Sequence, residues 1–494
     1  MARSPKQQSS SVSLSSVSSH AEREIKLTID DDFRLPRLSG TPLPRRLLTS
    51  TYYDTVAHDL ARAGITLRHR IKRGKQFWQL KIPLGEDRQE VEVAGTRNDP
   101  PAALRDVLII HLAHRKLVSV VTLRVWRSGV LVCRGRVPVA EIALDYVTAV
   151  NHGTIVLRFR ELEIEQRQGD AASLRALERR MREAGASDHD GRPKLFRALS
   201  LSTPTSPVQP EAEAPAGDHL KFVLAQHVGW LMAHDPGTRL STEIESLHQM
   251  RVATRRLRAV LRTCRPILSP AWVTPLEQEL RWLGEVLGPA RDLDVQIGYF
   301  IDESGRLPHR DRPLLAQFLA HLRTQRVVVQ QVMLSELTSA RYLELIHRLQ
   351  QAAQAPSVVE SPVGIRELAE GEFRKLRKAV RRLRPSSLDV ALHKIRIKTK
   401  RARYAAELAR ISVGKPAIRF MKAARAVQDL LGQHQDAIQA ERYLRQFVKY
   451  STSVRAGFLA GVIAERQRYR RDMVRREMTP LFNTLLKRGK KAWG

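Results

Sequence analysis

The sequence predicts an α+β region followed by an all-α region. Three observations lead to this prediction. Short segments in which charged and apolar residues alternate fill residues 21–202, a Pro/Ala/Glu-rich stretch follows at residues 203–218, and apolar residues then recur with helical spacing over residues 219–494. A chain of 494 residues is long enough for two or three domains, so we expect the stretch at 203–218 to be a linker between two of them.

Residues 1–20 are rich in Ser and lack an apolar core, so we expect a disordered tail and no signal peptide. No segment approaches the ~18 consecutive apolar residues that a membrane-spanning helix needs. The two cysteines, Cys133 and Cys264, are far apart and form no disulfide or metal-binding pattern. The sequence therefore predicts a cytoplasmic protein with no membrane partner.

The chain has 84 Lys and Arg against 51 Asp and Glu, a net charge of +33, and most of the excess lies in the helical region. Such a basic region needs a polyanion or must tolerate strong self-repulsion. Nucleic acid, an anionic membrane and polyphosphate all satisfy this charge. Aromatic residues make up only 5% of the chain and offer few surfaces for base stacking, which disfavours nucleic acid.

Within residues 21–202 the pattern predicts mostly strands, with helices at Pro100–His114 and Ala172–Ala184. Many short strands with charges on alternate residues favour a closed barrel with a polar interior. The expected strands are Glu22–Ile29, Leu47–Asp54, Thr66–Arg70, Gln76–Lys81, Gln89–Val93, Leu117–Val125, Gly129–Arg136, Val139–Tyr146 and Thr154–Glu165.

The first expected strand has an unusual charge pattern. Because side chains alternate between the faces of a strand, Glu22, Glu24 and Lys26 share one face and the apolar residues between them take the other. Two carboxylates and an ammonium on an inward face are explained by a metal cation that bridges to a polyanion.

Further expected strands place like or mixed charges on one face. A single strand of this kind is usually a solvated sheet face, but five in one domain point to a site. Arg and Lys suit phosphoryl oxygens, while clustered carboxylates suit Mg²⁺ or Mn²⁺, which is the combination that phosphoryl transfer to water requires. The residues are Arg68, Arg70, Lys81, Glu90, Glu92, Asp145, Glu161, Glu163 and Glu165.

The helical region contains an internal repeat. A break near residues 352–363 separates halves at about 219–352 and 364–494. His248–Arg258 aligns with His393–Arg403, and Leu287–Asp292 aligns with Leu431–Asp436, at almost the same offset. Two similar helical bundles that face each other across a pseudo-two-fold axis are the simplest interpretation.

Each half of the repeat carries a basic helix face. Residues of like charge three and four positions apart repel one another unless an anion lies against them, so two such faces would line one basic channel. The alternative is a solvated Arg-rich surface with Asp292 and Asp436 as internal partners. The residues of the two faces are His248, Arg251, Arg255, Arg258 and Arg262 in the first half, and His393, Arg396, Lys400 and Arg403 in the second.

Residues 21–202 resemble the CYTH family of triphosphate tunnel metalloenzymes. The matching pieces include Glu22-x-Glu24-x-Lys26, Tyr52-Tyr-Asp-Thr55, Gly64-Ile-Thr-Leu-Arg68-His-Arg70, Leu80-Lys81, Arg88-Gln-Glu90-Val-Glu92, Leu144-Asp145, Glu161-Leu-Glu163-Ile-Glu165 and Pro193-Lys194-Leu-Phe-Arg197. The resemblance implies an eight-stranded antiparallel tunnel that binds triphosphate with a divalent metal.

The same resemblance implies roles for single residues, with Tyr52 and Asp54 expected to shape a turn. The departures from the family pattern are Gln79, where the family usually has Thr, the polar residues Gln166, Arg167 and Gln168 after Glu165, and the weak match of Leu117–Arg127. The implied catalytic residues are Glu22, Glu24, Lys26, Glu90 and Glu92; the implied phosphate-binding residues are Lys26, Arg68, Arg70, Lys81, Arg124, Arg127, Lys194 and Arg197; the implied metal ligands are Glu22, Glu24, Asp145, Glu161 and Glu163.

Residues 219–494 resemble the CHAD family, through the motifs that begin at His248 and Leu287 and their counterparts at His393 and Leu431. The resemblance implies two four-helix bundles that bind inorganic polyphosphate. The second copy departs from the first, because Gln435 and Ile438 stand where the first copy has Arg291 and Asp294.

Together these patterns predict a metal-dependent triphosphatase that hydrolyses inorganic triphosphate with Mg²⁺ or Mn²⁺ and carries a polyphosphate-binding helical region. Three alternatives stay open at this stage. The first is a hydrolase or cyclase that acts on an organic triphosphate. The second is a non-catalytic polyphosphate-binding protein associated with polyphosphate granules. The third is a nucleic-acid binder.

Overall fold

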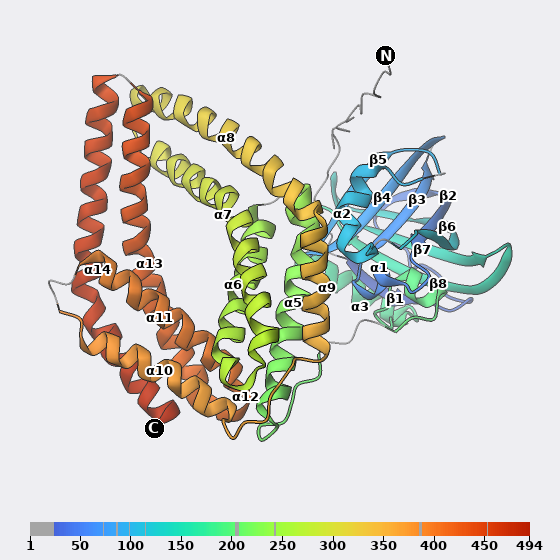
Figure 1. Ribbon diagram of the computed structural model, residues 1–494. Coiled ribbons are helices and arrows are strands. Elements are labelled where there is room, and N and C mark those ends of the chain that lie inside the picture. Colours follow the sequence, from blue (N-terminus) through green and yellow to red (C-terminus); the bar gives the residue numbers. More distant parts are fainter. Residues whose placement is uncertain are drawn as a thin grey trace, which may run out of the picture. The chain divides into compact units, whose positions relative to one another are not determined.

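The computed structural model describes residues 24–494 except residues 73, 85–86, 98, 114, 203–206, 242–243, 385–387 and 452. Glu22 and the expected tail at residues 1–20 lie outside the described residues. The chain divides into two compact units, residues 1–206 and 207–494, which we describe one at a time (Figure 1). The exact domain limits and the linker at 203–218 stay predictions; the first helix of the second unit already begins at Ala216.

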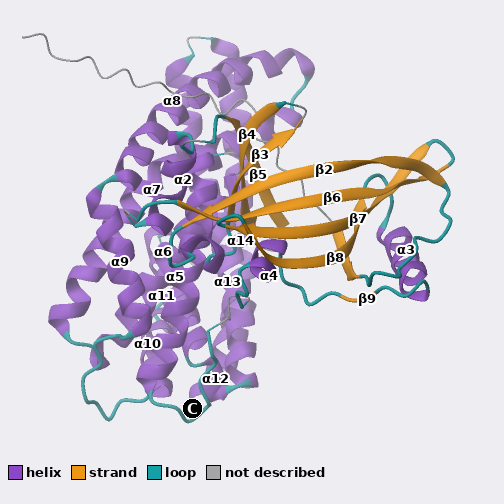
Figure 2. Cartoon of the chain, turned by 90° about the vertical axis from the view of Figure 1, so that its right-hand side faces the viewer, coloured by secondary structure: helices purple, strands orange, loops and turns teal. Residues whose placement is uncertain are grey.

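The first unit contains one antiparallel sheet in the order β5-β4-β3-β2-β6-β7-β8-β1-β9 (Figure 2). The strands are β1 (Glu24–Thr28), β2 (Gly40–Asp54), β3 (Thr66–Lys72), β4 (Lys75–Leu84), β5 (Asp87–Ala94), β6 (Val118–Arg134), β7 (Val137–Asn151), β8 (Thr154–Gln166) and β9 (Ser187–Asp188). Among the described residues the pairing ends at β5 and β9, so closure into a barrel stays a prediction.

Two of the expected strands, Leu117–Val125 and Gly129–Arg136, are a single strand, β6. Gly129 does not end this strand but allows a close approach, because a Cβ atom there would lie 2.0 Å from the Ile142 carbonyl oxygen of β7. The short strand β9 was not predicted. It has only two residues, too few for a periodic signal.

The helices of the first unit are short. They are α1 (Asp59–Arg62), α2 (Ala102–Leu112), α3 (Ala171–Glu183) and α4 (Lys194–Ala198). The Asp54 carboxylate accepts hydrogen bonds from the backbone N–H groups of Thr55, Leu60 and Ala61, which confirms its expected role in the turn after β2.

The two faces of β1 are divided as the alternation predicts. Leu27 packs in an apolar cluster with Leu162 and Ile164 of β8 and Met181 of α3. Glu24 and Lys26 lie on the other face and line a pocket together with Glu90 of β5. Because β1 and β5 are near opposite ends of the pairing order, the sheet must curve strongly to bring them to one pocket.

The second unit is helical. Its α-helices are α5 (Ala216–Leu240), α6 (Ile244–Cys264), α7 (Pro270–Gly305), α8 (Arg312–Thr338), α9 (Ala340–Gln354), α10 (Ile365–Arg381), α11 (Asp389–Leu408), α12 (Arg410–Val413), α13 (Lys415–Tyr450) and α14 (Val454–Trp493). Figure 1 shows α6 next to α5, and α13 next to α14. Among the described residues, no helix is long and apolar enough to span a membrane.

The repeat is visible in the packing of equivalent helices. In the first half, Arg251 of α6 donates a hydrogen bond of 3.0 Å to the carbonyl oxygen of Gly288 in α7. In the second half, the Arg396 guanidinium of α11 lies 3.6 Å from the place that a Cβ atom of Gly432 in α13 would take. The equivalent arginines therefore lie against equivalent glycines. The grouping into two four-helix bundles stays a prediction.

Candidate functional site: a charged pocket and a basic cluster

A pocket of about 220 Å³ in the first unit receives side chains from each of the strands β1 to β8 and from α4. Alternation along the strands directs these side chains to one face of the curved sheet. Six cationic and five acidic residues line the pocket: Lys26, Arg68, Arg70, Lys81, Arg127 and Lys194, with Glu24, Glu90, Asp145, Glu163 and Glu165. The structure thus brings together most of the site residues that the sequence predicted.

A buried acidic triad lies on β7 and β8. Asp145 is directly opposite Glu161 in the strand register, and Glu163 follows two residues later on the same face. One carboxylate oxygen from each residue can be chosen such that all three lie within 4.8 Å of one another. Asp145 and Glu161 are almost fully buried. Three carboxylates so close together need cations to remain ionised.

Two cationic side chains neutralise the triad. The Lys194 ammonium is 2.7 Å from carboxylate oxygens of Asp145 and Glu161 and 2.9 Å from Glu163. Arg127, opposite Asp145 in the register, donates two hydrogen bonds to the Asp145 carboxylate and one to Glu163. Burial acts to raise the pKa of Glu163, but the charges of Lys194, Arg127 and Lys26 outweigh it and hold this pKa well below its usual range.

The triad fits a hard divalent cation, because its donors are carboxylate oxygens and they converge on one point. In the structure that point is taken by the Lys194 ammonium, which touches all three carboxylates. A divalent cation held by Asp145, Glu161 and Glu163 would therefore require the Lys194 side chain to move away.

A second row of polar side chains crosses β2 to β5. Tyr52, Arg68, Gln79 and Glu92 are successive cross-strand neighbours. Arg68 donates to the Tyr52 hydroxyl at 3.1 Å and to the Gln79 side chain, and Gln79 donates to Glu92 at 2.8 Å. Glu92 therefore orients Arg68 through Gln79 and does not line the pocket itself.

Arg70 differs from the other cations of the pocket. Lys26 pairs with Glu24 at 2.9 Å and Lys81 with Glu90 at 2.8 Å, whereas the described residues show no ion pair or hydrogen bond for the Arg70 side chain. Burial and the charge of Arg68 lower the pKa of Arg70 to about 10. An anion in the pocket would relieve both effects.

Four of the described predicted site residues lie outside the pocket lining. Arg124 is exposed, because it is out of phase with its pocket-lining neighbours Leu123 and Val125, so its expected role in phosphate binding is not supported by its position. Arg197 stacks on the Phe159 ring at 3.9 Å and lies 3.5 Å from Glu161. The third is Glu92, as described above, and the fourth is Glu161, which is fully buried and contacts the pocket-lining Lys194 at 2.7 Å.

Sequence reasoning missed two contributors. Tyr52 was assigned to the turn, but it lines the pocket, and the charges of Arg68, Lys194 and Arg70 lower its pKa although burial acts to raise it. His189 lies in a loop, and its Nε2 is 3.5 Å from Glu161. No periodic pattern in the loop could have indicated this contact, whereas the alternation along β2 could have placed Tyr52 inward.

In the second unit α6 and α11 are in contact, and Arg255 of α6 is close enough to Arg396 and Lys400 of α11 for their charges to interact. That the two basic faces line one channel stays a prediction. We call Arg251, Arg255, Arg396, Lys400 and Arg403 the basic cluster. Burial and the positive charges of Arg396, Arg255 and Arg403 lower the pKa of Lys400 to about 7, although Asp436 acts in the opposite direction. The cluster thus concentrates more positive charge than its own carboxylates balance.

The alternative of internal acidic partners is partly correct. Arg251 forms an ion pair of 2.8 Å with Asp292. Arg403 donates to Gln428 at 3.1 Å, and the buried Nε atoms of Arg255 and Arg396 have no hydrogen-bond partner among the described residues. Most of the cluster is therefore not neutralised by carboxylates.

The remaining predicted residues of this face lie at its edges. Arg258 and Arg262 are exposed. His393 is exposed, and its Nδ1 lies 3.0 Å from Gln435, the residue that replaces Arg291 of the first repeat. His248 is half-buried, and burial with the charge of Arg291 lowers its pKa. The two equivalent histidines thus have different surroundings.

The fold and the charged pocket define a class of proteins, and comparison with known families identifies it. The CYTH domain model matches residues 20–195, and the CHAD domain model matches residues 223–445. The chain therefore carries a CYTH domain followed by a CHAD domain.

Several individual proteins are similar to this chain. An uncharacterized protein of Mycobacterium tuberculosis is 28% identical over 525 aligned residues, which cover 96% of this chain and 98% of the relative. Among solved structures, PptA from Streptomyces chartreusis is 20% identical with a TM-score of 0.45, covering 55% of this chain and 100% of its own. The CHAD domain from the plant Ricinus communis is 24% identical with a TM-score of 0.46, covering 56% and 94%.

A putative adenylyl cyclase from Hippeastrum, described as having a dominant triphosphatase activity, is 18% identical with a TM-score of 0.25. The alignment covers 37% of this chain and 98% of that one.

Proposed function

We propose that the CYTH domain hydrolyses inorganic triphosphate with Mg²⁺ or Mn²⁺ and that the CHAD domain binds inorganic polyphosphate. The observation that carries the first part is the pocket lined by six cationic side chains and by Asp145 and Glu163 of the buried acidic triad; the third member, Glu161, contacts the pocket-lining Lys194. Phosphoryl transfer to water requires this combination of carboxylates for a metal and cations for phosphate oxygens.

The size of the pocket supports an inorganic substrate. Its volume of about 220 Å³ is below the ~300–1,000 Å³ of sites that hold ordinary organic ligands. Its lining is dominated by charged side chains, and Tyr52 is the only aromatic residue among those that line it in the described structure. A nucleoside or thiamine moiety would need more room and more apolar surface than this pocket offers.

The pocket residues divide into two roles. Arg68, Arg70 and Lys81 would hold phosphate oxygens, with Arg70 the most available because it lacks an acidic partner among the described residues. Glu24 and Glu90 lie in the pocket wall, each beside a lysine. Their carboxylates would accept a hydrogen bond from the attacking water and fix its direction.

The metal would be held by Asp145, Glu161 and Glu163, where it would neutralise phosphate charge and lower the pKa of a bound water. Glu22, which lies outside the described residues, is also proposed as a ligand, together with Glu24. Lys194 of α4, displaced from the triad, would contact a phosphate oxygen. Arg127 and Lys26 would then balance the remaining carboxylate charge.

For the CHAD domain, the basic cluster supports binding of polyphosphate. Cations from two equivalent helices meet there, and burial together with their mutual repulsion lowers the pKa of Lys400. A flexible chain of phosphates can follow such a surface without base recognition. A nucleic-acid binder with the same charge would be expected to offer exposed aromatic rings on which bases stack. Tyr404, beside the cluster, is buried, and the Arg403 guanidinium lies 4.7 Å from its ring centre, so this ring is not open to a base.

The first experiment measures phosphate release from inorganic triphosphate by the full chain, with Mg²⁺, with Mn²⁺ and with excess chelator. We expect activity only with a divalent metal. Glu161→Gln should reduce it at least ~100-fold because the amide is a poor metal ligand. Glu183→Gln, an exposed carboxylate of α3, is the matched control and should leave activity unchanged.

Activity in chelator, or full activity of Glu161→Gln, would refute the metal-dependent mechanism. Metal binding measured by calorimetry without turnover would favour the non-catalytic alternative. Faster turnover of a nucleoside triphosphate than of triphosphate would favour an organic substrate.

The second experiment compares polyphosphate with single-stranded RNA of similar charge. We expect tighter binding of polyphosphate, and a loss of affinity when Arg255 and Lys400 are changed to Glu. The double variant Arg310→Glu, Arg323→Glu is a matched control, since both arginines are exposed and lie away from the cluster on the α7–α8 side. Equal or tighter binding of RNA would refute this part of the proposal.

A further inference from the structure

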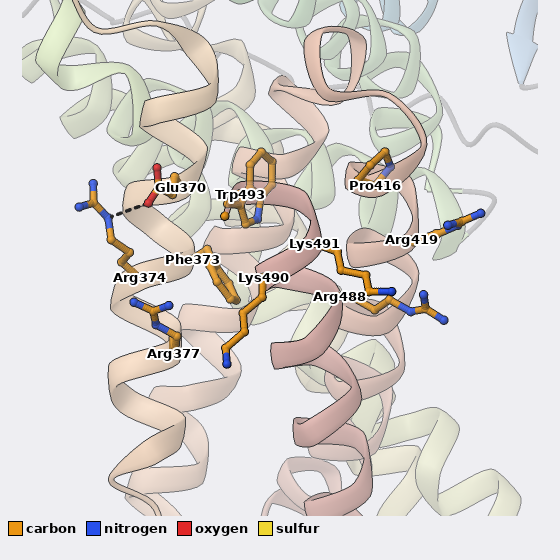
Figure 3. A pocket seen from close by; sticks show the side chains of 11 residues that line it. Glu370, Phe373, Arg374, Arg377, Pro416, Arg419, Arg488, Lys490, Lys491 and Trp493 are labelled. Carbon is orange, nitrogen blue, oxygen red and sulfur yellow. Dashed lines mark ion pairs between the residues drawn. The ribbon is translucent and has the colours of Figure 1, made fainter.

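A second pocket lies in the helical unit, near the end of α14. Its volume is about 630 Å³, within the range of ordinary ligand sites. The side chains around it come from α10, α13 and α14, as Figure 3 shows. Six of them are cationic: Arg374, Arg377, Arg419, Arg488, Lys490 and Lys491. We call this the C-terminal pocket.

The base of the C-terminal pocket is built from packed aromatic rings. Phe373 and Trp493 line the pocket, and Phe420 packs edge-on against both, with ring centres 5.6 Å and 6.1 Å away. A Cβ atom at Gly489 would lie 2.0 Å from the Phe373 ring. This glycine therefore permits the close approach of α10 and α14 that shapes the pocket.

The positive charge of the pocket is not balanced by its own acids. Glu370 is the only acidic side chain among the described residues that line it, and it pairs with Arg374 at 3.5 Å. Lys490 and Lys491 are favourable at the end of a helix, where the backbone dipole is negative. That effect does not explain Arg377 and Arg419, which project from other helices.

A buried donor also lacks an acceptor. The Trp493 side chain is 4% exposed, and its indole Nε1 has no hydrogen-bond partner among the described residues. A buried N–H group left unpaired costs about 1–3 kcal/mol. A ligand with oxygen acceptors in the pocket would be able to satisfy it after a small shift of the ring.

We propose that the C-terminal pocket is a second anion site, which binds the phosphate groups of a compact soluble oligophosphate. Guanidinium groups from α10, α13 and α14 can each offer two parallel donors to a phosphate. Phe373 and Trp493 are buried among other side chains and present no open ring face, so a base has nothing to stack on. Recognition is therefore of the phosphates alone.

This pocket is separate from the basic cluster. The residues that α10 contributes, Glu370, Phe373, Arg374 and Arg377, are spaced by three and four and share one helix face. On another face of α10, Glu372 interacts with Arg401 of α11, close to Arg258 and Arg262 of α6. The α14 residues of the pocket also lie beyond the segment that the CHAD domain model matches. The inference therefore does not depend on polyphosphate binding by the basic cluster.

Trp493 provides a local probe for the test. The full chain is labelled with 5-fluorotryptophan, and the ¹⁹F resonance that disappears in Trp493→Phe is assigned to this residue. Orthophosphate, pyrophosphate and triphosphate are then titrated without metal. We expect the Trp493 resonance to shift and saturate with triphosphate at a concentration at least tenfold lower than with orthophosphate, because more cations are engaged.

Three double variants separate this site from others. Arg377→Glu with Lys490→Glu should abolish the shift, whereas Arg310→Glu with Arg323→Glu, a change of equal charge on exposed residues, should retain it. In a third variant, Arg255→Glu with Lys400→Glu, the basic cluster is disabled and the Trp493 response should persist. This persistence distinguishes a pocket ligand from an effect transmitted through the helices.

Several results would overturn the inference. These are no shift with any phosphate, a shift that survives Arg377→Glu with Lys490→Glu, or a shift that is lost when only the basic cluster is changed. Vesicles that contain phosphatidic acid form a further arm. A response to these vesicles but not to soluble phosphates would identify a lipid headgroup as the source and refute the soluble ligand.

Discussion

Replacing Lys194 by Met tests whether the charged pocket has a cation position that a metal can take over. The Lys194 ammonium touches three carboxylates at 2.7–2.9 Å, and its side chain is 14% exposed. Burial lowers the pKa of Lys194, but the charges of Glu163, Asp145 and Glu161 outweigh it and raise this pKa. The stabilising charge is therefore fully present at neutral pH and is lost only in strong alkali.

The expected loss of stability is large. Removing one partner of a buried ion pair costs about 3–5 kcal/mol, because the other charge stays buried. For a unit of this size each kcal/mol lowers the melting temperature by about 2–4 °C, so the transition of the first unit should fall by roughly 6–20 °C in chelator. A divalent cation at 100 times its dissociation constant would restore about 2.7 kcal/mol.

The assay is calorimetric unfolding of the full chain, with and without Mn²⁺. Lys116→Met is the matched control, because Lys116 is exposed in the same unit and shows no ion pair among the described residues. We expect Mn²⁺ to raise the melting temperature of Lys194→Met more than that of the wild type, since the metal no longer has to displace an ammonium. A variant as stable as the wild type in chelator, or an equal response of both proteins to Mn²⁺, would refute this reasoning.

Three further predictions concern other residues. Arg70→Gln should leave thermal stability unchanged or slightly higher, because it removes repulsion from Arg68, while the KM for triphosphate rises roughly 10- to 100-fold; a large loss of stability would contradict this. Lys400 has a pKa of about 7 and loses its charge as the pH rises, so polyphosphate affinity should fall from pH 6 to pH 8. Lys400→Arg should flatten this pH dependence, because arginine stays charged; the same pH dependence in the variant would refute a role for the Lys400 charge. Gly489→Ala should destabilise the second unit by about 1–3 kcal/mol in thermal denaturation, because the added methyl clashes with the Phe373 ring. The control Gly371→Ala, where the added methyl meets nothing within 4 Å, should be neutral or stabilising; equal effects of the two variants would show that the Phe373 ring moves freely.

The alternation of charge determined much of the pocket in advance. Strand side chains have a fixed period of two, so the face shared by Glu24 and Lys26, or by Arg68 and Arg70, follows from the sequence as soon as a strand is assigned. Arg124, which the family resemblance implied, is exposed and out of phase with the pocket-lining Leu123 and Val125 of β6. One position of error moves a side chain to the opposite face.

The repeat in the helical unit was equally accessible from the sequence. Two motifs at nearly equal offset predicted equivalent helices, and Arg251 and Arg396 indeed lie against equivalent glycines. The sequence did not reveal that these faces differ in detail. Asp292 pairs with Arg251 in one half, while in the other His393 contacts Gln435.

The sequence by itself determined which side chains share a face, because that depends only on the local period of a strand or helix. Only the tertiary structure decided which faces meet. The Lys194 ammonium reaches Asp145, 49 residues away, because α4 returns to the sheet. The C-terminal pocket exists because α13 and α14 pack beside α10 near its Phe373. Contacts between distant segments depend on strand register and helix packing of the whole chain, which no local pattern records.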